Sequence, residues 1–404
     1  MRGKRWLLAC AALAAGEYAA LSFAECCALW PVMLVLAVLV FLYGYGFDLT
    51  GWPEAVLVLG GLALGFRASV AEVEFYRECP WLRGRNRVVR SMVDPSLVMT
   101  GRIRRALAKR VGLGLPPRSE VAALNRAILL GERRKLSGRT RQLFIESGTM
   151  HIFAISGLHV MAIATVLAVL VRVLFAVPGR WAGLVSLPVL WGYVLIIGSP
   201  PSAVRAAMMA SFGALAPIFW RRPDGLVSWS LTFLIVHLKS PEMMVNVGSV
   251  LSFAVMLSIQ LTGNALRGYG RCWWCSLATT VVAWAVGVPI AAHVFGRLTP
   301  GGILANLILI SAAQWTVYAG ALGVMASFCS VHLASHLNGL SSLFTQLMVL
   351  VSEVVSRLPG ANWEIANWTI GVCAVWYGGL LIAVILVRWL WRRLNRWIWY
   401  NKVR

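Results

Sequence analysis

The chain has 404 residues, of which 59% are apolar and 13% are charged, and its mean hydropathy is +0.75. A soluble globular protein needs far more charge on its surface, so this composition excludes one and predicts a polytopic membrane protein. The formal net charge of +22 means that the parts outside the membrane are strongly basic, which suits nucleic acid or anionic lipid headgroups as partners.

Residues 1–72 are predicted to form N-terminal transmembrane hairpins. They hold three apolar runs, at residues 6–30, 31–47 and 53–70, and a basic start at residues 1–5. A basic start before an apolar run is also typical of a signal peptide, but the length of the first run favours a membrane span.

Residues 73–148 are predicted to form a basic amphipathic segment at the membrane interface. Between Arg77 and Arg141 there are 17 Lys or Arg and only 4 Asp or Glu. Apolar residues recur at helical spacing around Ile103 and again around Leu124, and Pro116 with Pro117 separates the two groups. Anchoring to lipid headgroups and contact with nucleic acid are both consistent with this composition.

The rest of the chain is predicted to be a membrane core at residues 149–330 and a C-terminal part with a basic cytoplasmic tail at residues 331–404. Candidate spans are Met150–Val177, Trp181–Gly198, Ser202–Trp220, Leu226–Leu238, Met243–Leu261, Trp273–Phe295, Gly301–Cys329, Val331–Val355 and Asn367–Val387. The run at residues 331–355 carries several polar residues, so it could instead lie along the interface. The expected fold class is all-α, a polytopic integral membrane protein with about a dozen transmembrane helices plus amphipathic interfacial helices.

Short basic connections predict the orientation. Arginines fall in alternate connections, at residues 180, 221–222, 267–271 and 388–396, which should therefore be cytoplasmic. The basic segment before Met150 then faces outward, where it would meet an incoming polyanion first. Long segments are largely exempt from the positive-inside rule, so we give the short connections more weight.

Polar residues open the run that begins at Met150. His151, Ser156 and His159 lie within it, beside Gly148 and Gly157. On a continuous helix both histidines fall within a quarter turn of each other, and such a polar face must look at protein or water. A helix-packing seam held by hydrogen bonds and a functional site both fit these residues.

The same stretch resembles the signature of the ComEC competence family, inner-membrane channel proteins of bacterial DNA uptake. The resemblance rests on Gly148-Thr149-x-His151-x-x-Ala154-Ile155-Ser156-Gly157-Leu158-His159-Val160, preceded by Leu130-Gly131-Glu132-Arg133. Further matching motifs follow in the same order, so the resemblance covers roughly residues 95–330.

The downstream motifs supply the remaining candidate residues. Gly198-Ser-Pro-Pro-Ser-Ala-Val-Arg205 resembles the family's Ser-Pro-Ser-x-x-Arg motif, and Arg205 could contact phosphate at a pore mouth or snorkel to the interface. Ser252 lies in a stretch close to the family's Gly-Phe-Gln-Leu-Ser-Phe, although Ser249 and Val250 replace the aromatic and the glutamine. Asn306 and Gln314 follow a Phe-Gly and Pro-Gly-Gly region and share one helix face, as interhelical contacts or as pore lining.

The resemblance implies a channel that carries single-stranded DNA across the inner membrane during natural transformation. Its expected path is lined by His151, Ser156, Gly157, His159, Arg205, Ser252, Asn306 and Gln314. Expected partners are single-stranded DNA, membrane lipids, a periplasmic DNA receptor and a cytoplasmic translocation motor, with a homo-oligomer as an open possibility. The chain should be a multi-pass protein of the bacterial inner membrane without catalytic activity, and neither the family's small β-barrel domain nor its metallo-β-lactamase-like domain fits the sequence.

No cofactor or metal is expected. Of the eight cysteines, Cys272 and Cys275 have the spacing of a metal or redox pair, but no second pair or nearby histidine accompanies them.

Two alternatives stay open. An intramembrane serine hydrolase or protease could use Ser156 with His159 or His151, although the sequence shows no acid to orient the histidine. A carrier for another solute would fit the same topology.

Overall fold

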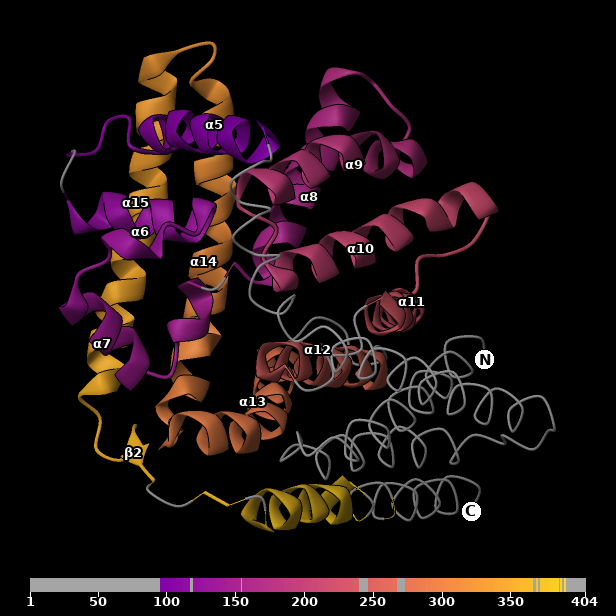
Figure 1. Ribbon diagram of the computed structural model, residues 1–404, viewed down its shortest axis with the longest axis vertical. Coiled ribbons are helices and arrows are strands. Elements are labelled where there is room, and N and C mark those ends of the chain that lie inside the picture. The colour runs from indigo at the N-terminus through magenta and orange to yellow at the C-terminus, as the bar shows by residue number, and fades with distance from the viewer. Residues whose placement is uncertain are drawn as a thin grey trace, which may run out of the picture.

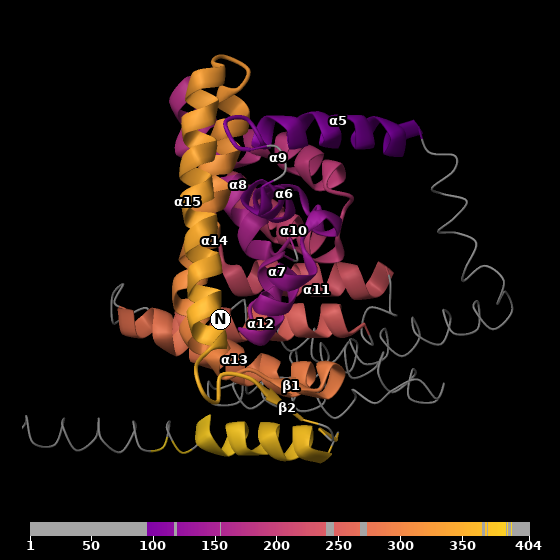
Figure 2. The same ribbon diagram turned by 90° about the vertical axis from the view of Figure 1, so that its left-hand side faces the viewer.

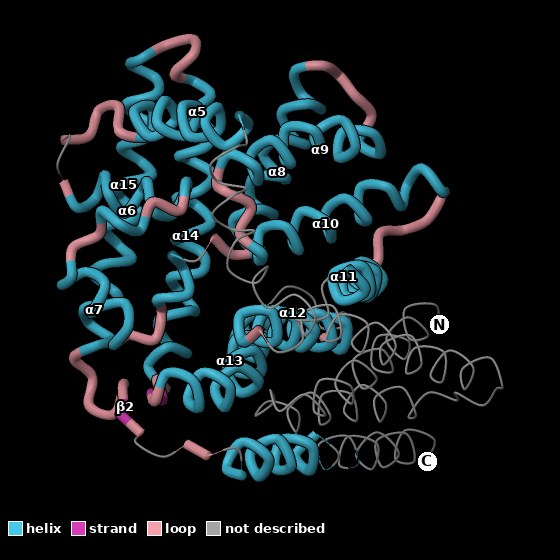
Figure 3. The backbone as a smooth tube through the Cα atoms, viewed as in Figure 1, coloured by secondary structure: helices cyan, strands magenta, loops and turns pink. Residues whose placement is uncertain are grey.

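The computed structural model describes residues 95–384, except 117–118, 154, 240–245, 267–272, 366–367 and 370, together with residues 386 and 389. The three apolar runs predicted before residue 72 lie outside this part. The described part is almost entirely helical, and its only strands are the two-residue β1 (Arg297–Leu298) and β2 (Trp363–Glu364), an antiparallel pair (Figure 3). An all-α membrane fold is therefore confirmed in outline, while the sequence did not predict the small strand pair.

Helices α8 to α15 follow the predicted spans in order, and most of their ends lie within four residues of the prediction, although α8 begins seven residues later than predicted. They are α8 (Gly157–Leu174), α9 (Gly179–Ile196), α10 (Pro201–Leu215) with the 3₁₀ turn η3 (Ala216–Phe219), α11 (Gly225–Lys239), α12 (Val247–Ala265), α13 (Trp273–Phe295), α14 (Gly301–Ala326) and α15 (Val331–Ser356). An apolar helix at Gly371–Val384 follows. Six helices of the described part are long and apolar enough to cross a membrane, and three shorter apolar helices accompany them.

An antiparallel hairpin of α14 and α15 forms the long axis of the described part (Figures 1 and 2). Each of these two helices has 26 residues, about 39 Å at 1.5 Å per residue, which exceeds the roughly 30 Å of bilayer hydrocarbon. Helix α15 can thus span the membrane beside α14. The helices α10 to α13 lie crosswise to the hairpin in both views.

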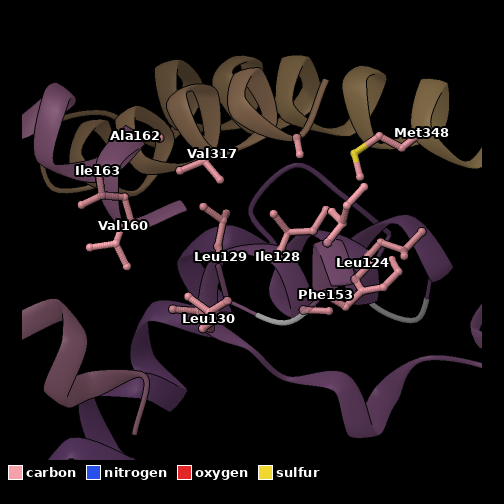
Figure 4. Close-up of a cluster of buried hydrophobic side chains, with 14 of the residues drawn as sticks. Leu124, Ile128, Leu129, Leu130, Phe153, Val160, Ala162, Ile163, Val317 and Met348 are labelled. Carbon is pink, nitrogen blue, oxygen red and sulfur yellow. The ribbon is translucent and has the colours of Figure 1, made fainter. Parts of the chain in front are cut away.

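Helix α6 (Glu120–Leu130) packs on the middle of this hairpin. Seven of its eleven residues are buried, and Figure 4 shows Ile128 and Leu129 directed toward the hairpin that carries Val317 and Met348. The expectation that this helix rests on the membrane interface is therefore wrong for α6, because its apolar side is covered by protein. Amphipathic spacing alone cannot distinguish a lipid partner from a protein partner.

A glycine in α14 lets α6 approach the hairpin. A Cβ atom placed on Gly320 would lie only 2.4 Å from Cδ1 of Leu129, which is itself buried. The helices before and after α6 also pack on the hairpin. Helix α5 (Pro95–Val111) crosses one end of it, and α7 (Gly138–Glu146) packs on α15 (Figure 1). Residues 95–148 and the predicted membrane core thus share one packed interior.

Gly320→Ala should destabilise the protein by about 1–3 kcal/mol, because the added methyl group overpacks a closed contact with Leu129. The matched control is Gly339→Ala in α15, where a Cβ meets nothing within 4 Å and alanine favours the helix by up to about 1 kcal/mol. Thermal unfolding in detergent measures both variants. Equal unfolding temperatures would contradict the close packing of α6 on α14.

Candidate functional site

The residues before α8, 148–153 with 155–156, form an irregular segment and not a continuous helix, and we call it the broken segment. Gly148 has a φ of +72°, a short 3₁₀ turn η2 (Met150–Phe153) follows, and Ser156 is extended at φ −94° and ψ 168°. Helix α8 begins at Gly157. The prediction of one helix from Met150, with both histidines on one face, is therefore wrong, because Ser156 takes the N-cap position that serine favours.

Side chains from other elements bind the backbone carbonyls of the broken segment. Arg133, in the 3₁₀ turn η1 (Arg133–Lys135), donates its Nε to the carbonyl oxygen of Phe153 at 2.6 Å, and Ser202 of α10 donates its hydroxyl to that of Ile155 at 2.6 Å. Partial burial and the nearby charge of Arg141 lower the pKa of Arg133, although a guanidinium remains cationic at neutral pH. Irregular backbone at membrane depth is tolerated when its polar groups are satisfied in this way.

Ser156 and His159 contact each other at the start of α8. The Ser156 Oγ lies 2.8 Å from Nδ1 of His159, and the Ser156 backbone N–H donates to the same nitrogen at 3.2 Å. Because an N–H can only donate, Nδ1 is the acceptor and the neutral ring carries its proton on Nε2. That Nε2 is buried and has no hydrogen-bond partner among the described residues. No carboxylate therefore orients this ring in the described part of the chain.

The first turn of α8 packs against α10 and α12. A Cβ atom on Gly157 would lie 3.5 Å from Cβ of Ala206 and 3.5 Å from Cε of Met256. These are ordinary contact distances, so a methyl group would fit, and close backbone approach does not require glycine here. At Gly148 it does, because a Cβ would lie 2.5 Å from Oγ1 of Thr299.

Arg205 lies next to this contact, on α10. Only 5% of the residue is exposed, and its guanidinium donates to Oγ of Ser252 at 3.3 Å and to the carbonyl oxygen of Gly248 at 3.4 Å, both long for hydrogen bonds. Its Cζ lies 5.2 Å from the ring centre of Phe253, within cation–π range. The structure thus brings the predicted residues Arg205 and Ser252 together.

No acid compensates the charge of Arg205 within the described residues. The ion pairs found there join Lys135 with Glu132, Arg297 with Glu364 and Arg357 with Glu353. A guanidinium has five N–H donors, and two long bonds leave capacity for an anion. The arrangement can therefore take a phosphate oxygen without first breaking an ion pair to a described residue.

The other predicted residues lie apart from Arg205. The side chain of His151 is exposed on η2. Asn306 and Gln314 lie on α14, where Gln314 donates to the Tyr318 hydroxyl at 2.6 Å and Oδ1 of Asn306 is buried without a partner among the described residues. None of their hydrogen bonds reaches Arg205 or Ser252.

Sequence reasoning missed an aromatic cluster beside Arg205. His237 of α11 is 1% exposed, and its ring lies 4.1 Å from Phe233 and 5.2 Å from Phe253 between ring centres. Trp229 stacks on Phe233 at 5.2 Å. The four-residue spacing of Trp229, Phe233 and His237 in the sequence was the available signal, because it places all three on one side of a helix.

Comparison with known proteins identifies the family. The family model described as Competence protein matches residues 128–390, about two thirds of the chain, and this match covers α8 to α15 and the site around Arg205. The chain belongs to the Competence protein family. No solved structure matches it.

The sequence similarity to three curated relatives covers only part of each protein. ComE operon protein 3 of Bacillus subtilis is 24% identical over 208 residues, which are 52% of this chain and 26% of the relative. Competence protein ComA of Neisseria gonorrhoeae is 24% identical over 266 residues, 63% of this chain and 38% of the relative. The uncharacterized protein YcaI of Escherichia coli is 24% identical over 291 residues, 66% and 36% respectively. The chain thus spans well under half the length of these relatives.

Proposed function

We propose that this competence-family chain forms a channel of the bacterial inner membrane through which single-stranded DNA enters the cell during natural transformation. Family membership and the names of two relatives support a role in competence. The observation that carries the more specific proposal is the buried Arg205, which has no acid partner among the described residues.

A buried arginine in a membrane helix needs an explanation. Placing one near the bilayer centre costs about 2.5–3.5 kcal/mol, and such residues usually mark a substrate path. Structural anchoring of α10 to α12 would be served better by short hydrogen bonds than by contacts of 3.3 and 3.4 Å. A passing phosphodiester supplies the missing negative charge, and a guanidinium binds phosphate in bidentate fashion.

The surroundings of Arg205 suit a single strand of DNA as well as an isolated anion. The start of α8, with Ser156, Gly157 and His159, packs against α10 and α12. Its contact on α10 is Ala206, which follows Arg205 directly in the sequence. Discontinuous helices that meet in this way form the substrate sites of many membrane transporters. We propose that this junction lines part of the DNA path.

The proposed channel acts without catalysis and without a cofactor. Among the described residues no group of three or more His, Cys, Asp or Glu could hold a metal ion. The sequence also contains no phosphate-binding glycine loop followed by Lys and Ser or Thr, so a separate motor would drive the strand. A periplasmic receptor would deliver the DNA, and membrane lipids surround the helices.

A second candidate function is an intramembrane serine hydrolase. It is favoured by the distance of 2.8 Å between Ser156 Oγ and His159 Nδ1, which suits a nucleophile and its base. The Nε2 of His159 has no hydrogen-bond partner among the described residues, which speaks against a hydrolase, because a catalytic histidine is normally oriented through its second nitrogen.

Deletion of the gene tests the proposal. A deletion strain should lose transformation and should no longer accumulate labelled single strands in the cytoplasm, and expression of the chain should restore both. Transport of small solutes should be unchanged in the same strain. Normal transformation of the deletion strain would refute the channel, and a selective loss of solute uptake would favour a carrier.

A further inference from the structure

Helix α5 is fastened to the turn between α14 and α15. Arg110 donates through Nη1 to the carbonyl oxygen of Ser327 at 2.9 Å and to its Oγ at 2.8 Å, and its guanidinium lies 3.9 Å from the ring centre of Phe328. Asn338 of α15 donates to the carbonyl oxygens of Arg110 and Leu113 at 2.8 and 3.1 Å. The C-terminal end of α5 therefore sits at one end of the hairpin, as Figure 2 shows.

The segment that follows α5 reaches the other end of the hairpin. Gly148 packs against Thr299 and Gly302, where α14 begins. The 25 steps from Gly302 to Ser327 span roughly 37 Å at 1.5 Å per residue. If α14 crosses the bilayer, whose hydrocarbon is about 30 Å thick, Arg110 and Gly148 lie at opposite membrane faces.

The basic connection between α8 and α9 indicates which face belongs to α5. This connection carries Arg180 and is expected to be cytoplasmic, and in Figure 1 it lies toward the same end of the hairpin as the turn between α14 and α15. Because Arg110 binds Ser327 in this turn, α5 shares its face. This departs from the sequence-based expectation that the whole basic segment faces outward.

The outer side of α5 is a stripe of positive charge. Arg102, Arg105 and Lys109 are exposed at spacings of three and four residues, and α5 contains no Asp or Glu. Its other two cations are used inside the protein, since Arg104 donates to the carbonyl oxygen of Leu130 and Arg110 to Ser327. Three cations without an acidic neighbour on the helix make a surface for anions.

Exposed apolar side chains at the same end distinguish between two kinds of anion. Met99 is 65% exposed, Phe328 68% and Val331 60%. Apolar side chains beside basic ones suit a bilayer surface, where they reach acyl chains while the cations meet headgroups. Helix α5 itself carries no aromatic residue on which nucleic acid bases could stack, and one face of the exposed Phe328 ring is covered by the guanidinium of Arg110. The observations favour lipid over nucleic acid.

We infer that the stripe of Arg102, Arg105 and Lys109 binds anionic phospholipid headgroups of the cytoplasmic leaflet, at the face opposite to Gly148. The stripe anchors α5, and through Arg110 it holds the turn between α14 and α15 at the membrane surface. This site is separate from Arg205, so its failure would leave the proposed channel untouched.

Lysine labelling tests the face. The sequence has only five lysines, so a modified peptide identifies its lysine, and Lys109 is native and exposed. A membrane-impermeant amine reagent should modify Lys109 in inside-out vesicles and not in intact spheroplasts. Arg357→Lys, at the far end of α15 where the side chain of Arg357 is 76% exposed, should show the reverse pattern. Labelling of Lys109 in spheroplasts would overturn the inference.

Lipid selectivity tests the ligand. Purified protein is reconstituted in phosphatidylethanolamine vesicles with a minor fraction of spin-labelled phosphatidylglycerol. Replacing Arg102, Arg105 and Lys109 by Gln should weaken the association of this lipid on the order of fivefold per cation. The matched control replaces Lys135, Arg139 and Arg141, three exposed cations on η1 and α7, and should keep the selectivity. Equal losses in both variants, or lost DNA binding with unchanged lipid association, would overturn the inference.

Discussion

Arg205→Glu should abolish DNA uptake, with a loss on the order of a hundredfold or more. The variant places a carboxylate where the wild type holds a buried cation, and a buried unpaired charge costs several kcal/mol. It would also repel every phosphate that passes. Transformation frequency and cytoplasmic accumulation of labelled strands measure the loss, after the variant is shown to insert and accumulate normally.

Two milder variants separate phosphate binding from a structural role. Lysine keeps the charge but not the fork of donors, whereas glutamine keeps hydrogen-bond donors that could reach Ser252 or Gly248 without the charge. If Arg205 binds phosphate, Arg205→Lys should retain far more uptake than Arg205→Gln. A purely structural arginine predicts that glutamine serves at least as well as lysine.

A matched control applies the same change at an exposed site. The side chain of Arg357 is 76% exposed and pairs with Glu353 at 2.8 Å, a surface ion pair of small value. Arg357→Glu should therefore leave uptake near the wild-type level. Uptake by Arg205→Glu equal to that of this control would exclude Arg205 from the DNA path.

The sequence predicted the order and ends of most helices because apolar runs are long and are separated by basic or proline-containing connections. It also singled out Arg205 and Ser252, each within its own motif. Their contact could not be predicted, because it depends on how α10 packs against α12. The contact of His237 with Phe253 could not be predicted for the same reason, because these residues lie on different helices, α11 and α12.

Two errors have a common physical cause. Hydropathy treats α6 as a surface helix and residues 150–156 as part of a span, because it records the polarity of side chains and not what covers them. Leu129 is covered by α14, where Gly320 leaves room for it, and the extended backbone of Ser156 makes it the N-cap at which α8 begins. Capping preference was visible at Ser156, since serine before a glycine and an apolar run is typical of an N-cap.

Ser156→Ala should retain most DNA uptake if the chain is a channel. Among the described residues the hydroxyl of Ser156 is hydrogen-bonded to the side chain of His159, and the backbone N–H of residue 156 can still donate to Nδ1 of that ring. The expected loss is within about threefold, the effect of roughly half a kcal/mol at an N-cap. Ser156→Leu should block uptake, because a large side chain would crowd the junction with α10 and α12.

Ser202→Ala supplies the comparison that separates the two functions. The Ser202 hydroxyl holds the carbonyl oxygen of Ile155 at 2.6 Å, so its removal should disturb the broken segment at least as much as Ser156→Ala does. In a channel the two alanine variants should therefore behave alike, or Ser202→Ala should be the worse. In a hydrolase the order reverses, since loss of the nucleophile removes on the order of 10⁴-fold or more of activity.

A fluorophosphonate probe, which reacts with activated serines, gives a readout independent of transport. The channel predicts no covalent labelling at Ser156, because nothing among the described residues orients His159 through Nε2. Labelling at Ser156 that disappears in His159→Ala, together with a loss of function in Ser156→Ala and none in Arg205→Glu, would replace the channel by the hydrolase. The two variants thus test the same junction in different ways, since Ser156→Ala removes the oxygen that lies beside His159 and Arg205→Glu reverses the buried charge that could guide a phosphate there.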